Sequence, residues 1–128
     1  MRSVLLQIPA RPEFVRVARM AIAAAASCAG FTVDQIDEIK QSVGEACSNA
    51  VSAVHRSGGT AVTLHCYLDD EGICIEVSPV IGLSLDSGQE DEHTSFQYLL
   101  IKTLMDDVEI LKTDDGVESV RFRRSLSA

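Results

Sequence analysis

The chain has 128 residues, 46% of them hydrophobic, and a formal net charge of −8 at pH 7. This length predicts a single domain, residues 1–128, with one core. No apolar run approaches the roughly 18 residues of a membrane-spanning helix, and the start MRSVLLQIPA lacks the long apolar region of a signal peptide, so we expect a cytoplasmic protein. The acidic balance disfavours nucleic acid and anionic membranes as partners and favours a basic partner.

The first two elements are predicted from an apolar run and two prolines. Residues 3–8 are mostly apolar and end at Pro9, which indicates a strand. Pro12 favours the start of a helix, and Gly30 favours its end. The expected buried stripe of this helix is Phe14, Val17, Ala18, Ala21, Ile22 and Ala25. Its positive charges, which suit a solvated face, are Arg11, Arg16 and Arg19.

Residues 32–59 predict the central helix of the domain. Thr32 and Gln35 form a Thr-x-x-Gln capping box at its start, and two glycines, residues 58–59, stop it. Glu45 and Asn49 are four residues apart, so they project from the same side of the helix as a carboxylate and amide pair. They lie beside an apolar stripe formed by Ile36, Ile39, Val43, Cys47, Ala50 and Val54.

Residues 60–77 predict an antiparallel hairpin followed by a long loop. Residues 60–68 alternate between apolar and polar side chains, residues 69–72 suit a turn, and residues 73–77 form the returning strand. Residues 78–93 contain Pro79, Gly82, Gly88 and several acidic residues. A loop of this length is unusual in a compact domain, which indicates a lid or a partner-binding loop.

The remaining elements are a third helix and a final hairpin. Thr94 and Gln97 offer a second capping box, and the apolar stripe of this helix is expected at Phe96, Leu99, Leu100, Thr103 and Leu104. Residues 108–111 and 117–122 flank a turn at residues 114–116. The resulting order, β-α-α-β-β-α-β-β, predicts an α+β protein: a two-layer α/β sandwich with three helices on one face of a mixed, mainly antiparallel sheet.

The four cysteines include no Cys-x-x-Cys pair, the spacing that is typical of metal sites and redox motifs. Each lies in an apolar segment, so we interpret them as small, reduced core residues rather than as metal ligands. They are Cys28, Cys47, Cys66 and Cys74.

The run DEIKQSVGEACSNAV, residues 37–51, resembles the N box of the GHKL ATPase superfamily, and within it the small bacterial branch of anti-sigma factor serine kinases. A second matching stretch, LLIKTLMDDVEI, covers residues 99–110, after the position of the nucleotide lid. The resemblance extends over nearly the whole chain in length and element order. It implies the histidine-kinase-like ATPase fold.

The resemblance also implies roles for individual residues. Asn49 matches the residue that ligates a magnesium ion on the nucleotide phosphates, and Glu45 matches the general base toward the hydroxyl that is phosphorylated. The alternative is a polar pair on an exposed helix face. Arg16 matches an arginine near the phosphates or the partner surface. The His that usually follows the Asn by four residues is replaced by Ala53, and we interpret His55 as a helix-end residue.

Other nucleotide motifs of the family are eroded in this chain. The Asp that reads the adenine amino group falls at Pro79 or Ser78, Gly82 is the nearby glycine, and residues 94–97 replace a glycine-rich hinge. Ser119 matches a hydroxyl residue that contacts the adenine region. Losing one charge-assisted hydrogen bond costs on the order of 1.5–3 kcal/mol, so we expect ATP and magnesium to bind weakly or not at all.

Two functions follow from the resemblance. The first is an anti-sigma factor with serine/threonine kinase activity, which binds a sigma factor and phosphorylates an anti-sigma-factor antagonist. The second is a non-catalytic binding module of the same fold in a partner-switching pathway. We further expect a homodimer that associates through the first strand or the first helix, and a cleft between the second helix and residues 78–93 into which Glu45 and Asn49 point.

Overall fold

The computed structural model describes residues 2–83 and 92–126, and within them the predicted order of elements is confirmed. No helix in this part of the chain is both long and apolar enough to span a bilayer. The strands are β1 (Arg2–Pro9), β2 (Ala61–Leu68), β3 (Gly72–Val80), β4 (Asp107–Lys112) and β5 (Glu118–Ser125). The helices are α1 (Pro12–Ala29), α2 (Val33–Ser57) and α3 (Glu92–Leu104).

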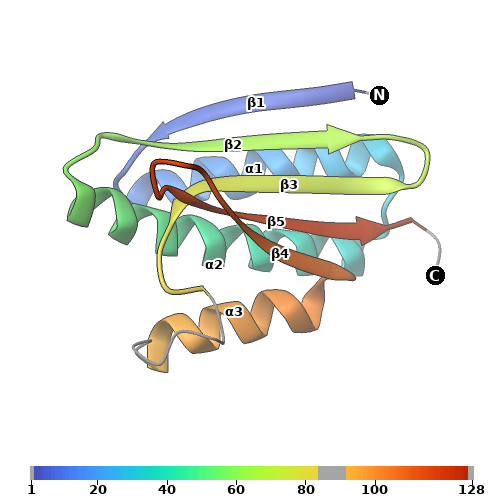
Figure 1. Ribbon diagram of the computed structural model, residues 1–128. Coiled ribbons are helices and arrows are strands. Elements are labelled where there is room, and N and C mark those ends of the chain that lie inside the picture. The colour runs from blue at the N-terminus through green and yellow to red at the C-terminus, as the bar shows by residue number, and fades with distance from the viewer. Residues whose placement is uncertain (1, 84–91, 127–128) are drawn as a thin grey trace.

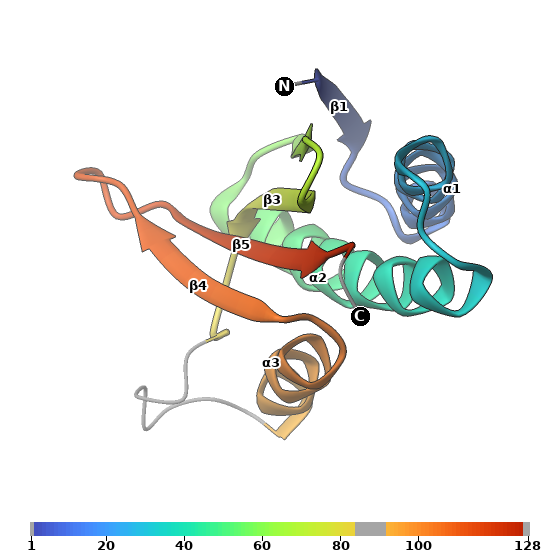
Figure 2. The same ribbon diagram turned by 90° about the vertical axis from the view of Figure 1, so that its right-hand side faces the viewer.

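The five strands form one sheet in the order β1-β2-β3-β5-β4, and each of these pairings is antiparallel. The helices lie on one side of this sheet, with α2 in the middle (Figures 1 and 2). The two-layer α+β architecture is therefore confirmed, and the described pairings include no parallel one.

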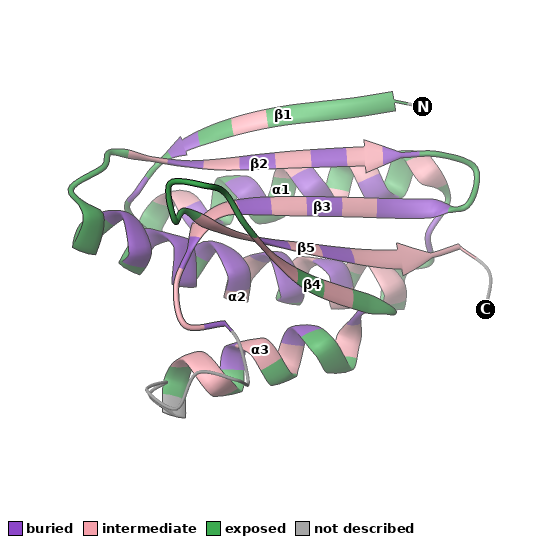
Figure 3. Ribbon diagram, viewed as in Figure 1, coloured by how far each residue is buried: buried purple, intermediate pink, exposed green. Residues whose placement is uncertain are grey.

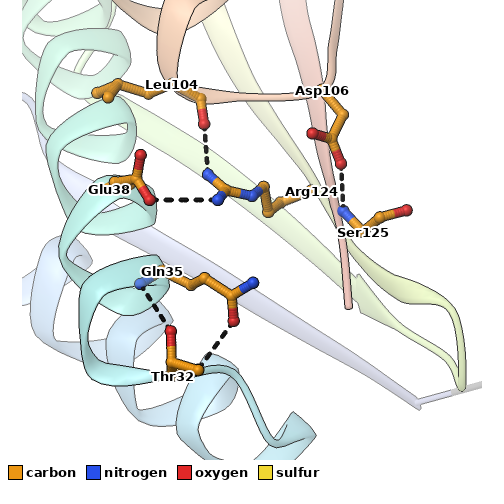
Figure 4. Close-up of polar contacts among 7 residues, drawn as sticks. All are labelled: Thr32, Gln35, Glu38, Leu104, Asp106, Arg124 and Ser125. Carbon is orange, nitrogen blue, oxygen red and sulfur yellow. Dashed lines mark hydrogen bonds and ion pairs between the residues drawn. The ribbon is translucent and has the colours of Figure 1, made fainter. Parts of the chain in front are cut away.

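The core lies between the sheet and the helices. Alternate residues of β2 are buried, as the alternating sequence predicts (Figure 3). Their side chains point to the helix layer, toward the buried residues of α2. The predicted capping box at the start of α2 is confirmed, because Gln35 N donates to Thr32 Oγ1 at 3.2 Å and Thr32 N donates to Gln35 Oε1 at 2.9 Å (Figure 4). Gly58 ends the helix with φ of 81°, in the left-handed region.

The buried stripe of α1 differs from the predicted one. Val17 is 47% exposed, whereas Val15, Ala18, Ile22 and Ala26 are buried. The alanines make several faces of this helix apolar, so the periodicity alone does not select the buried face.

The start and the buried face of α3 also differ from the prediction. The helix begins at Glu92, so Thr94 lies inside it and the predicted Thr94–Gln97 capping box is wrong. Phe96 and Leu99 are 59% and 55% exposed, whereas Gln97 is almost fully buried. β3 continues to Val80, so only residues 81–83 of the predicted loop are described as such, and residues 84–91, with Gly88, lie outside the described residues.

The C-terminal end of α3 is held in place by contacts with β5 and α2. Arg124 of β5 donates to the Leu104 carbonyl at 2.6 Å and to a Glu38 carboxylate oxygen of α2 at 3.2 Å (Figure 4). Asp106 accepts a hydrogen bond from Ser125 N at 2.6 Å. These contacts fix the position of α3 beside α2, the two helices that carry the candidate site.

The cysteines are free thiols, and their burial agrees only partly with the prediction. Cys47 and Cys66 are buried in the core, Cys74 is half-buried and Cys28 is exposed, so the core interpretation is wrong for Cys28. Burial raises the pKa of Cys47 to about 12 and that of Cys66 to about 11, and in Cys66 the neighbouring Cys74 adds to the rise.

Candidate functional site

The side chain of Asn49 is buried, with 2% of its surface exposed, and it faces the segment that leaves β3. Its Oδ1 accepts a hydrogen bond from Ile81 N at 2.8 Å, and its Nδ2 donates to Ile81 O at 2.7 Å. A single side-chain amide therefore satisfies both main-chain groups of Ile81. Because those groups lie beyond the last ladder position of β3, Asn49 holds in place the backbone that continues toward residues 82 and 83.

Gln97 extends this pair into a network of buried amides. Its Oε1 accepts a hydrogen bond from Asn49 Nδ2 at 3.2 Å, and its Nε2 donates to the main-chain oxygen of Glu45 at 3.4 Å. Gln97 is itself only 1% exposed. Through these contacts the N-terminal half of α3 is joined to α2 and, by way of Asn49, to the exit of β3.

Sequence reasoning missed the role of Gln97, which was assigned to a helix cap. In the structure, Gln97 and Ile101 of α3 and Met105 just after it are buried at a spacing of four, so Gln97 lies on the true buried face of the helix. Apolar residues on the other faces of α3 conceal this in the sequence. A glutamine on a buried face requires internal hydrogen-bond partners.

The hydrogen bonds that Asn49 makes affect whether it can ligate magnesium, the role that the family resemblance implies. Both Nδ2 hydrogens are donated, and Oδ1 points at the amide of Ile81. A magnesium ion requires oxygen ligands that it can approach together with its remaining water molecules. The Asn49 oxygen accepts one hydrogen bond and keeps a second lone pair, but the side chain is 2% exposed, so a hydrated magnesium ion reaches that oxygen only if the contact with Ile81 opens.

Glu45 is half-buried and lies one turn before Asn49, but its side chain lines a different hollow. This hollow has a volume of about 160 Å³ and lies between α1 and α2, with Arg19, Gln41 and Ser48 among its walls. The structure therefore brings Asn49 to Ile81, at the start of the predicted lid, and places Glu45 on the side of α1. The two side chains do not line one hollow within the described part of the chain.

Arg19, rather than Arg16, is the arginine of α1 that lies beside Glu45. A Cβ atom built on Gly44 would come within 3.2 Å of Arg19 Cδ, so the glycine leaves the space that the arginine stem occupies. Arg16 is exposed on α1 and lines none of the hollows described here.

The other predicted site residues are distributed over β3 and β5. Gly82 follows Ile81 with φ of 66°, a conformation that favours glycine, and it faces Thr94 of α3. Ser119 alternates with the buried Val120, so it faces the side of the sheet away from α2. Ser119 is therefore not brought together with Asn49, whereas its neighbour Glu118 is on the helix side. No carboxylate stands at Ser78 or Pro79.

A family model described as the histidine kinase-like ATPase domain matches residues 8–124. The chain belongs to this family, as its β-α-α-β-β-α-β-β order and antiparallel sheet also indicate.

Several proteins of similar sequence share the name serine-protein kinase RsbW. The chain is 34% identical to serine-protein kinase RsbW of Halalkalibacterium halodurans over 127 residues, which cover 88% of this chain and 76% of the relative. It is 34% identical to serine-protein kinase RsbW of Listeria innocua, with 91% and 83% covered. It is 31% identical to serine-protein kinase RsbW of Bacillus cereus, with 88% and 78% covered. The resemblance identified from the N box is thereby confirmed.

Proposed function

We propose that this chain is an anti-sigma regulatory protein that binds a sigma factor and an anti-sigma-factor antagonist, and that it binds magnesium-ATP weakly or not at all. The similarity to serine-protein kinases over most of the chain supports the regulatory part of this proposal. The protein partners are the proposed ligands, and the cytoplasm is the proposed location.

The hydrogen bonds of Asn49 are the main support for weak or absent nucleotide binding. Its amide is engaged by Ile81 and Gln97 at distances of 2.7–3.2 Å, and both polar side chains are buried. A nucleotide-bound magnesium ion would have to break a satisfied, desolvated network before Asn49 could ligate it. Breaking such contacts leaves buried polar groups without partners, which costs about 1–3 kcal/mol for each group.

Gln97 supports the same conclusion from a second direction. The residues aligned with the family's glycine-rich hinge, 94–97, lie inside α3 rather than before it, so that alignment is wrong. What Gln97 does here is join α3 to α2 through buried hydrogen bonds. Together with the missing carboxylate at Ser78 and Pro79, this favours a protein whose α3 is held in place by its own side chains rather than by a nucleotide.

One observation favours the alternative, a protein kinase acting on the antagonist. The Glu45 carboxylate is half-exposed in a hollow beside Arg19, so it is accessible to a partner's hydroxyl group. For Glu45 to act as the general base of a phosphoryl transfer, the transferred phosphoryl group and the accepting hydroxyl must both lie beside it. In that case Asn49 would release Ile81 on nucleotide binding.

We also propose a homodimer that uses the free edge of β1 and the adjoining face of α1. β1 pairs with β2 on one side, and its Val4 and Leu5 are 38% and 68% exposed. On α1, Val17 and Met20 are 47% and 60% exposed. Apolar edge strands of this kind are normally covered or paired. The variant Leu5→Lys is expected to convert the dimer into a monomer in light scattering, and a wild-type monomer at high micromolar concentration would remove this part of the proposal.

The experiment that tests the proposed function is a partner-binding assay with and without magnesium-ATP. Each sigma factor of the source organism is titrated into the purified protein, and the antagonists are then tested for competition and for phosphorylation. We expect one sigma factor to bind with the same affinity in both conditions, and the antagonist to displace it without being phosphorylated. A sigma complex that forms only with ATP, or a phosphorylated antagonist, supports the kinase alternative.

A further inference from the structure

The sheet ends at β4, on the side opposite β1 (Figure 2). Within the described residues, no strand pairs with the outer side of β4. An antiparallel edge strand directs the N–H and C=O groups of every second residue away from its partner, and these groups can bind another strand. The six residues of β4 therefore leave backbone donors and acceptors for an added strand of about 20 Å.

The side chains of β4 alternate between the two faces of the sheet. Val108 and Ile110 are half-buried and pack against the core on the helix side. Asp107 and Glu109 are exposed on the outer face, which no helix covers. A strand added beside β4 would therefore extend an apolar layer on one face and meet two carboxylates on the other.

Charges alternate across the outer face in the register of the sheet. Arg121 of β5 is paired in register with Glu76 of β3 on one side and with Glu109 of β4 on the other. Its guanidinium lies 2.7 Å from the Glu109 carboxylate and 4.0 Å from that of Glu76. The row thus runs negative, positive, negative from β3 to β4, and the next position, beyond the edge, favours a cation.

The neighbouring row ends in a carboxylate as well. Arg123 is paired in register with Asp107, and its guanidinium lies 3.6 Å from Glu71. No ion pair joins Asp107 to another residue in the described part of the chain. Each of the two arginines faces two carboxylates, so the outer face at this edge has an excess of negative charge. Lys112 lies on the helix side, where it is paired in register with Glu118.

The side chains of β4 disfavour a second copy of this chain on the same edge. Antiparallel pairing of two β4 strands centred on Glu109 puts that carboxylate opposite itself, and pairing centred on Val108 puts Asp107 opposite Glu109. Pairing centred on Ile110 puts Lys112 opposite Val108 on the apolar side. β1, in contrast, contains no carboxylate, so the two edges of the sheet favour different partners.

We infer that the free edge of β4 binds an extended segment of a protein partner in which basic and apolar residues alternate. The basic side chains lie opposite Asp107 and Glu109, and the apolar side chains lie opposite Val108 and Ile110. Main-chain hydrogen bonds to the edge supply affinity, and the cross-strand charge pairs supply selectivity. The inference rests on the proposed function only in that a protein partner supplies the segment.

The test uses a pair of synthetic peptides. The probe is acetyl-Thr-Val-Ile-Lys-Val-Lys-amide, whose lysines fall opposite Glu109 and Asp107 when it pairs antiparallel with β4. The control peptide has glutamate at both lysine positions and keeps the apolar residues. Each peptide is titrated into the ¹⁵N-labelled protein. We expect the lysine peptide to shift the backbone amides of residues 107–112 with saturation and to slow their hydrogen exchange, and the glutamate peptide to leave them unchanged.

Two double variants that remove the same chemical groups serve as test and control. Asp107→Asn with Glu109→Gln is expected to weaken binding of the lysine peptide by roughly two- to thirtyfold, the combined effect of two cross-strand charge pairs. Asp37→Asn with Glu13→Gln changes exposed positions on α2 and α1, and it is expected to leave the affinity unchanged.

Four results would overturn the inference. They are binding of the glutamate peptide as tight as that of the lysine peptide, no shift of any β4 amide with the lysine peptide, and an equal loss of affinity in the two double variants. The fourth is a shift of β4 amides with protein concentration in the absence of peptide, which would identify a second copy as the occupant. The titration needs neither a sigma factor nor a nucleotide, so its failure is separable from failure of the proposed function.

Discussion

Replacing Asn49 by alanine tests whether its side-chain amide is a buried structural group or a solvated metal ligand. The side chain makes hydrogen bonds of 2.8, 2.7 and 3.2 Å, to both main-chain groups of Ile81 and to Gln97, and it is 2% exposed. Removal leaves these buried partners unsatisfied, at about 1–3 kcal/mol for each group. Allowing for water that enters the vacated space, we expect Asn49→Ala to lower the free energy of unfolding by about 3–5 kcal/mol.

The assay is urea unfolding, monitored by circular dichroism, with the slope of the transition compared between variants. Ser42→Ala is the matched control on the same helix, because the Ser42 hydroxyl is buried without a hydrogen-bond partner in the described structure. That variant is expected to leave stability unchanged or to raise it by about 1 kcal/mol. A loss of less than about 1 kcal/mol for Asn49→Ala would refute the structural role, since alanine in place of a solvated helix residue slightly favours the helix.

Three further predictions concern the nucleotide site, the contacts of Arg124 and the buried thiol of Cys66. The double variant Pro79→Asp with Gln97→Gly restores a carboxylate and removes the blocking amide, so it is expected to bind magnesium-ATP at least about tenfold more tightly than the wild type in calorimetry. Arg124→Ala removes the contacts between β5, α3 and α2 and is expected to lower the free energy of unfolding by about 1–3 kcal/mol, whereas Arg124→Lys restores only part of it, because lysine lacks the fork geometry. The pKa of Cys66 is raised by burial from an ordinary value of 9.0 to about 11, so its neutral thiol stabilises the fold fully below about pH 9, and this contribution is lost as the pH rises toward 11. Urea unfolding at pH 8 and pH 10.5 is expected to show a smaller pH-dependent loss in Cys66→Ala than in the wild type, and an unchanged loss in the exposed control Cys28→Ala.

The architecture was predictable because local patterns and long-range packing agree in this chain. The capping box at Thr32 and Gln35, the stop at Gly58 and the alternation through β2 each define an element without reference to its neighbours. Which face of each helix is buried was harder to predict. In α3 the run of apolar residues around Leu99 and Leu100 fills nearly every face, so periodicity does not show that the buried face begins at Gln97.

The sequence predicts which residue types form the candidate site but not which groups their side chains contact. The spacing of Glu45 and Asn49 places both on one side of α2, but spacing alone does not determine what each side chain contacts. Asn49 bonds to Ile81, which is 32 positions away in the chain, and Gln97 is 48 positions from Asn49. Contacts of this range arise from the packing of α2, β3 and α3 against one another. The strand register turns Ser119 away from α2 and Glu118 toward it. A single serine in the sequence does not reveal this register.

If the protein regulates its partners without depending on a nucleotide, the wild-type protein should bind magnesium-ATP weakly or not at all, and calorimetry measures this binding. We expect no saturable heat up to about millimolar ATP, which corresponds to a binding free energy weaker than about −4 kcal/mol. A dissociation constant in the low micromolar range, about −8 kcal/mol, would contradict it. That result would show that Asn49 leaves Ile81 and Gln97 at little cost and that the nucleotide site is functional.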